Sequence, residues 1–151
     1  MSNQDKDTNI ILSISTALIN GSNVDQCVIF SDDRGDGSSS SGNSKNYISK
    51  VNKGKKVNWT ASVNPNSGQS NPGDTVTVVA VLKKPDNLGG DDILEKDCYY
   101  QNGNLVEGKV KSNAELDATE NYLVVFAVTT ASTAQTTSYI IDPRIKIVTQ
   151  N

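Results

Sequence analysis

The chain contains no histidine among its 151 residues, and this absence removes several classes of catalytic and metal site. Ser-His-Asp and Cys-His catalysis both need an imidazole base, and many metal sites need an imidazole ligand. The two cysteines, Cys27 and Cys98, are too few for a zinc site built from thiolates. They form one disulfide or remain two buried thiols, and a cytoplasmic location favours the thiols.

Aromatic residues are also scarce, at 5% of the chain, so the core must be built mainly from Val, Ile, Leu and Ala. No apolar run approaches a membrane span, and the N-terminal segment MSNQDKDTN lacks the basic and apolar regions of a signal peptide. We therefore expect a cytoplasmic protein with no membrane partner. The net charge of −3 argues against nucleic acid as a partner, because phosphate binding requires a basic surplus.

What the chain does contain is a series of short alternating segments rich in β-branched residues, which favours an all-β fold. In one of them Val57, Trp59, Ala61 and Val63 share a face, so we predict that Trp59 lies in the core rather than on a sugar-binding surface. Seven to nine strands in one domain, spanning 1–151, indicate an antiparallel β-sandwich or a flattened barrel. The main predicted strands are 9–16, 27–30, 47–51, 56–63, 74–81, 121–128 and 139–148.

Turn chemistry separates these strands. The polar run SDDRGDGSSSSGNSKN at 31–46 is typical of a flexible, exposed loop. Asn102-Gly103 is the strongest local signal, because both residues accept the positive φ of a type I′ turn, and it predicts a β-hairpin between 99–101 and 104–106. Residues 129–137 form a predicted Thr/Ala/Ser connection, and 112–120 have room for one helical turn.

The order of these segments resembles the bacterial inclusion-body proteins of the PixA/AidA family. That family has an early strand ending in a Thr-x-Leu-like step, a Gly-x-x-Val/Ile-x-Trp strand, a Gly-Gly-Asp-like segment, a Tyr-x-Val-x-Phe strand and a closing Asp-Pro-x-Ile-x-Ile strand. The corresponding residues here are Thr16 and Leu18, Gly54 to Trp59, Gly89 to Asp91, Tyr122 to Phe126, and Asp142 to Ile147.

The resemblance spans most of the chain, although each motif is short and mostly structural. It implies a soluble, cytoplasmic β-sandwich that packs into inclusions and is expressed in a density-dependent or symbiosis-associated way. It supplies no active site. The chain departs from the family in having Met1 as its only methionine and in carrying a Ser-rich loop at 37–44.

Asp32, Asp33 and Asp36 are the candidate ligands for a calcium ion. Read as an EF-hand loop from Asp32, the segment has an acid at the first and fifth positions and a glycine at the sixth. Arg34 occupies the third position and Asn43 the last, where the motif needs an oxygen ligand and a bidentate glutamate. A solvated acidic loop is therefore the preferred interpretation, with Ca²⁺ binding kept as the alternative.

Two clusters of opposite charge stand apart in the sequence. The basic stretch at 45–56 has no acids, and it either holds an anion or forms a solvated edge where lysines discourage stray strand pairing. A third reading is that it docks on the acidic stretch of a neighbouring copy, which gives a heterologous contact that propagates into rings or filaments. The residues assigned to this contact are Lys53, Lys55, Lys56, Asp91, Asp92 and Glu95.

Together these features predict a non-enzymatic, self-assembling or storage protein whose partner is itself, as a homo-oligomer or lattice, with no cofactor. An enzyme is not expected, because acid–base chemistry would rest on acids in 86–97 that nothing places in a cleft. The alternative is a β-sandwich module that binds a small ligand, a carbohydrate or Ca²⁺ at the 31–44 and 84–92 loops.

Overall fold

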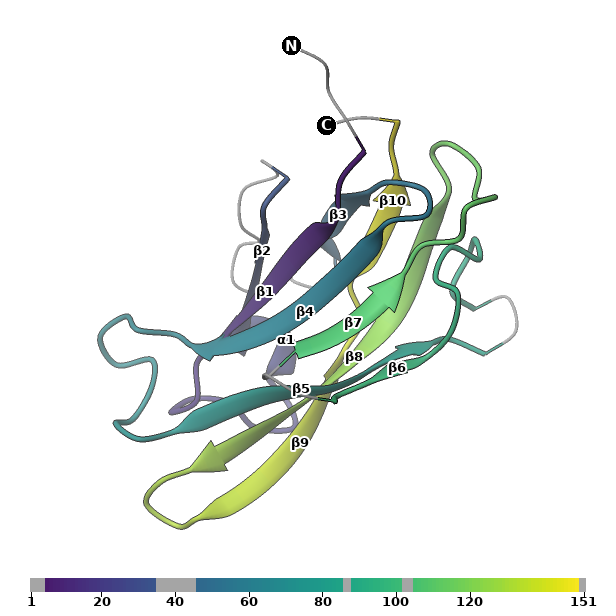
Figure 1. The fold of residues 1–151 in the computed structure, drawn as a ribbon. Helices are drawn as coiled ribbons and strands as arrows, with labels where there is room; N and C mark the ends of the chain where they lie inside the picture. The colour runs from purple at the N-terminus through teal and green to yellow at the C-terminus, as the bar shows by residue number, and fades with distance from the viewer. Residues whose placement is uncertain (1–4, 35–45, 86–87, 102–104, 150–151) are drawn as a thin grey trace.

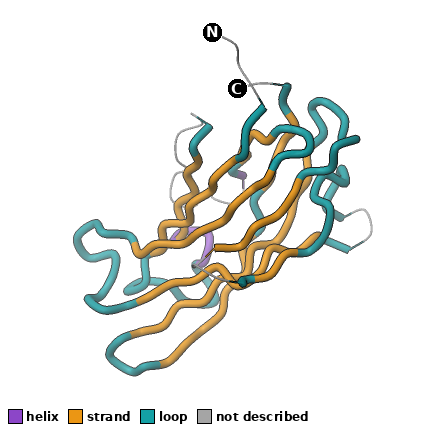
Figure 2. Tube along the Cα trace, viewed as in Figure 1, coloured by secondary structure: helices purple, strands orange, loops and turns teal. Residues whose placement is uncertain are grey.

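The structure, a computed structural model, describes residues 5–34, 46–85, 88–101 and 105–149. These residues form two β-sheets that pack face to face, together with one short helix (Figure 1). Strand dominates the trace and the loops gather at the two ends of the sandwich (Figure 2). The prediction of a strand-built, layered domain is therefore confirmed.

The first sheet has four strands in the order β2-β1-β4-β7. β1 pairs antiparallel with β2 but parallel with β4, and β4 pairs antiparallel with β7. The helix α1 (Val24–Cys27) leads directly into β2. The strands are β1 (Thr8–Ile14), β2 (Val28–Asp32), β4 (Lys56–Val63) and β7 (Leu105–Lys109).

The second sheet has six strands, in the order β3-β10-β8-β5-β6 with β9 paired to β8. β3 runs parallel to β10, while β8 is antiparallel to β5, β9 and β10. The strands are β3 (Ile48–Val51), β5 (Thr75–Lys83), β6 (Cys98–Tyr99), β8 (Thr119–Thr130), β9 (Gln135–Ile141) and β10 (Arg144–Ile147).

The expectation of a strictly antiparallel sandwich is wrong, because β1–β4 and β3–β10 are parallel pairs. The reason lies in the connections. The chain leaves the first sheet after β2, forms β3 in the second sheet and returns as β4, so β4 enters beside β1 by a crossover rather than by a hairpin.

The predicted β-hairpin around Asn102-Gly103 does not form. The turn itself lies outside the described residues, but its flanking strands belong to different sheets: Tyr99 in β6 pairs with Ala80, and Val106 in β7 pairs with Trp59. The connection therefore crosses from one layer of the sandwich to the other.

The two layers share one core, and Trp59 lies at its centre. Its side chain is fully buried, and its indole Nε1–H donates a hydrogen bond of 3.0 Å to the Tyr122 hydroxyl across the two sheets. The two rings meet edge to face, with centroids 5.6 Å apart. Gly108 makes room for the indole, since a Cβ there would lie 3.0 Å from the ring. The prediction of a core tryptophan is confirmed.

Candidate functional site

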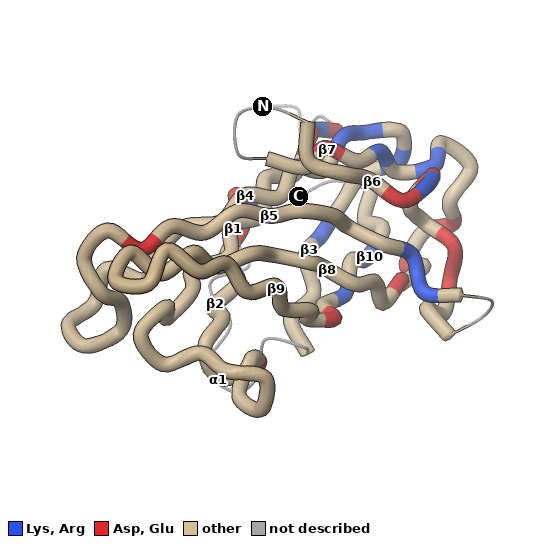
Figure 3. Tube along the Cα trace, turned by 90° about the horizontal axis from the view of Figure 1, so that it is seen from below, with Lys and Arg blue, Asp and Glu red and all other residues tan. Residues whose placement is uncertain are grey.

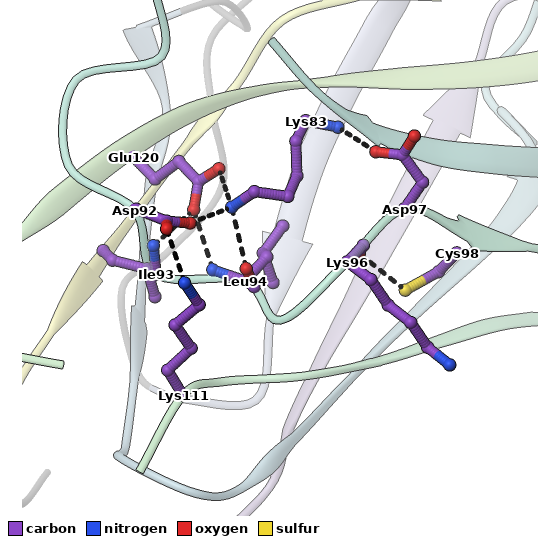
Figure 4. A network of polar contacts seen from close by, with 9 residues as sticks. All are labelled: Lys83, Asp92, Ile93, Leu94, Lys96, Asp97, Cys98, Lys111 and Glu120. Carbon is purple, nitrogen blue, oxygen red and sulfur yellow. Dashed lines mark hydrogen bonds and ion pairs between the residues drawn. The ribbon is translucent and has the colours of Figure 1, made fainter. Parts of the chain in front are cut away.

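A network of charged side chains joins β5, β8 and the segment before β6 (Figure 4). The Glu120 side chain is only 3% exposed. Its Oε1 accepts hydrogen bonds from the backbone N–H groups of Ile93 and Leu94 at 2.7 and 2.8 Å, and its Oε2 accepts one from Lys83 Nζ at 2.8 Å. The Lys83 ammonium also donates to the Leu94 carbonyl and to Asp92.

This network is built for holding the chain rather than for catalysis. Burial acts to lower the pKa of Lys83, but hydrogen bonds to Asp92 and Glu120 outweigh it and raise that pKa. Lysine bases and nucleophiles need a lowered pKa, so Lys83 stays protonated and unreactive. Hydrogen bonds from Lys111 and Lys83 lower the pKa of Asp92, which stays charged. The network therefore fixes segment 91–95 against the second sheet.

The candidate calcium ligands are engaged with other side chains. Asp32 closes β2, and its carboxylate accepts from the Tyr47 hydroxyl and from the backbone N–H of Arg34. The Asp33 carboxylate accepts from the backbone and the side-chain amide of Asn9. Asp36 lies outside the described residues. Within the described parts of the chain, no cluster of three or more acidic or cysteine side chains is arranged to hold a metal ion.

Two of the residues assigned to a charged contact between copies, Lys55 and Glu95, lie at the same end of β7. Val110 N–H donates to the Lys55 carbonyl, and Glu95 N–H donates to the Lys109 carbonyl. Lys56 forms an ion pair with Glu107. Asp91 accepts from Thr119 N–H, Asp92 pairs with Lys83 and Lys111, and Lys53 is exposed.

A cleft of about 520 Å³ opens where β6 of one sheet approaches β7 of the other. Its lining includes Cys98, Gly108, Lys56, Glu107 and Tyr99. Cys98 and Cys27 are free and buried, as predicted, and burial raises the pKa of both thiols. A raised pKa leaves little thiolate at neutral pH, so neither thiol is a nucleophile.

Charged residues are distributed unevenly between the two ends of the sandwich, and we did not predict this distribution from the sequence. Figure 3 shows lysine, arginine and acidic residues gathered at one end, while the other end is almost free of them. The loops 15–23, 64–73 and 131–134 make up this neutral end. The signal is visible in the chain, because 8–24, 57–73 and 121–141 contain no charged residue.

Asp74 ties the three loops of the neutral end together. Its carboxylate accepts hydrogen bonds from the Ala131 backbone N–H at 2.9 Å and from the Thr16 hydroxyl at 2.7 Å. These bonds lower the pKa of Asp74, so the carboxylate stays ionised. A further bond of 2.7 Å joins Ser15 and Gln69. The loops of the neutral end are therefore held to one another by hydrogen bonds.

The hairpin of β8 and β9 projects from this end (Figure 1). Gln135 to Ser138 are exposed at every position, on both faces of the strand, and Ile140 is 57% exposed. Cross-strand bonding stiffens the hairpin, since the Thr129 and Thr136 hydroxyls lie 2.8 Å apart. Among the described residues, β9 pairs with β8 alone. The outer backbone of β9 is therefore an open sheet edge over Gln135–Ser138, while α1 also contacts this strand.

No protein-family model and no curated protein matches this chain. Among solved structures, it is similar to the crystal structure of an inclusion body protein, PixA, from Burkholderia cenocepacia J2315, with a TM-score of 0.61 and 16% sequence identity. The match covers 95% of this chain and 97% of the other. At this identity the likeness concerns the fold. Within the described residues, no helix is long and apolar enough to span a membrane.

Proposed function

We propose that this protein is a non-enzymatic, self-assembling protein of the inclusion-body type that accumulates in the cytoplasm. The observation that carries the proposal is the likeness to the PixA inclusion body protein, which extends over nearly the whole of both chains. A whole-chain match means that the shared architecture is the entire domain and not one common motif.

The arrangement of charge supports the proposal. The chain has a net charge of −3, and identical copies with the same net charge repel each other. Close packing therefore needs contact surfaces without like charges. The neutral end provides such a surface, because its loops carry polar but uncharged side chains (Figure 3).

The chemistry of the ionisable groups is consistent with a protein that has no reaction to perform. Lys83 is held protonated, the two thiols are held neutral, and Glu120 already accepts three hydrogen bonds. None of these groups is poised to transfer a proton or attack a substrate.

The test is light scattering and electron microscopy of the purified full chain across a concentration series without any ligand. We expect oligomers and then particles to grow with concentration. A protein that stays monomeric up to millimolar concentration would overturn the proposal.

A second function, binding of a small ligand, a carbohydrate or Ca²⁺, is favoured by one observation, the cleft of about 520 Å³ between β6 and β7. Titration with CaCl₂ and with simple sugars, followed by NMR of labelled protein, tests it. Saturable shifts confined to residues around Cys98 and Gly108 would support the binding module over assembly.

A further inference from the structure

The exposed half of β9, Gln135–Ser138, lies at a sheet edge and carries no charge. Natural proteins protect sheet edges with charged side chains, proline or bulges, because an open edge pairs with any available strand. The other edge strands follow this rule, since β2 contains Asp32, β3 contains Lys50, and β7 contains Glu107 and Lys109. β6 spans only two residues and follows Asp97 directly. β9, with the sequence QTTSYII, has no charged residue or proline within the strand, and Asp142 and Pro143 follow only at its far end.

The surroundings of β9 are neutral on the side of its turn, whereas α1, which contacts β9, carries Asp25. The turn that precedes β9, 131–134, is uncharged. Asp74 is bonded to this turn, and its two carboxylate oxygens accept hydrogen bonds from Thr16 and Ala131. The acid that follows β9, Asp142, pairs with Lys84. A second copy can therefore approach the turn half of this edge, Gln135–Ser138, without meeting an unpaired acid of the turn.

The side chains along β9 also suit a strand partner. Thr136, Ser138 and Ile140 alternate with the inward-facing Tyr139 and Ile141, so they project from the outer face of the second sheet. Threonine, isoleucine and tyrosine are among the residues that favour strands, and threonine pairs across antiparallel strands form hydrogen bonds. In an antiparallel pairing centred on Ser138, Ser138 faces its own copy and Thr136 faces Ile140 of the other copy.

We infer that β9 is the edge through which two copies of this chain pair, antiparallel and about a two-fold axis, so that their six-stranded sheets continue into one. This inference rests on the proposed self-assembly and names its surface. The contact is isologous, so it closes a dimer, and a larger particle needs a second contact, for which the charged end of the sandwich is available.

The size of the contact sets its behaviour. β9 has seven residues, whereas a stable protein interface uses about 20–30 residues on each side. Dimers should therefore form only as concentration rises. Because the edge is uncharged, dimer formation should change little with salt, unlike a contact between lysines and acids.

Ser138 provides the test, because it is exposed near the middle of β9 and its substitution leaves the core intact. The variants are Ser138→Lys and Ser138→Glu. The matched control is Ser62→Lys, which places the same charge at an exposed position of β4 in the other sheet. Native mass spectrometry and sedimentation velocity of the full chain report dimers, and circular dichroism confirms that each variant is folded.

We expect wild type and Ser62→Lys to dimerise alike, both Ser138 variants to remain monomeric at the same concentration, and an equimolar mixture of the two Ser138 variants to form heterodimers. Ser138 variants that dimerise like wild type would overturn the β9 contact while leaving self-assembly in place. Monomeric Ser138 variants that fail to recover on mixing would overturn the two-fold pairing of β9 with itself. A wild-type chain that never associates would overturn the proposed function, and this inference with it.

Discussion

Removing the indole of Trp59 should destabilise the protein by a large fraction of its total stability. Trp59 is fully buried between the two sheets, so Trp59→Ala deletes a large core side chain and leaves a cavity. Such truncations cost about 3–5 kcal/mol, against a total of about 5–15 kcal/mol for a domain. The emission of this single tryptophan should also be blue-shifted and resistant to quenching in the native protein.

The hydrogen bond to Tyr122 allows a sharper version of this experiment. Tyr122→Phe leaves the buried indole N–H without its partner, which costs about 1–3 kcal/mol. Trp59→Phe leaves the Tyr122 hydroxyl unpaired in the same way. The double variant leaves neither group unpaired, so its loss should be smaller than the sum of the single losses by about 0.5–3 kcal/mol.

Urea denaturation followed by circular dichroism measures the wild type and all these variants on one scale. The matched control is Tyr99→Phe, because Tyr99 is largely exposed and its hydroxyl is not part of the core. If Trp59→Ala lowers the unfolding free energy no more than this control, or if the two single losses simply add, the view of Trp59 as the bonded centre of both layers is refuted.

Three other predictions concern pH, thiols and salt. Because hydrogen bonds lower the pKa of Asp74, its contribution to stability is complete above the ordinary pKa of 3.8 and is lost as pH falls through the lower folded-state pKa. The Asp74→Asn variant should therefore lose less stability than the wild type on acidification. An acid-unfolding profile equal to that of the wild type would contradict this prediction. Thiol titration of the denatured, unreduced protein should find both Cys27 and Cys98 free, and a result of zero would mean that they pair. Lys55 and Lys56 are predicted to contact acids of a neighbouring copy, so association beyond the dimer should weaken as salt rises and when both lysines are changed to Glu. Particles of unchanged size under both conditions would refute this contact.

The strands and the core could be predicted from the sequence because alternation is a local signal. The period of two between Val57 and Val63 places Trp59 inward whatever the pairing partner is, and the structure agrees. Strand direction is not local in this way. β1 and β4 are parallel because β3 lies between them in the chain but belongs to the other sheet, and no residue in β1 records that.

The end of the chain shows how turn signals limited the prediction. The connection 129–137 was expected to be long, but only 131–134 turns, because the flanking threonines favour strands. Ala134 takes φ 55° there, a conformation that usually calls for glycine or asparagine. Segment 139–148 was expected to be one strand. It divides into β9 and β10 at Pro143, which has no N–H to donate, although both pair with β8 in one continuous register.

The charged contact was assigned from opposite charges that stand apart in the sequence, and it stays a prediction. The fold adds that Lys55 and Glu95 lie at the same end of β7. The neutral end could have been found in advance, because its three loops come from three charge-free runs. That these runs meet at one end, and that one of them supplies an open strand edge, depends on the topology of both sheets.

Hydrogen–deuterium exchange of the backbone amides, measured by mass spectrometry at low and high protein concentration, tests the central claim most directly. If copies assemble by pairing β9, amides of Gln135–Ile141 should exchange more slowly at high concentration, while those of β2, an edge strand of the other sheet, should not change. Equal exchange of β9 at both concentrations, in a sample that light scattering shows to be assembled, would contradict the account.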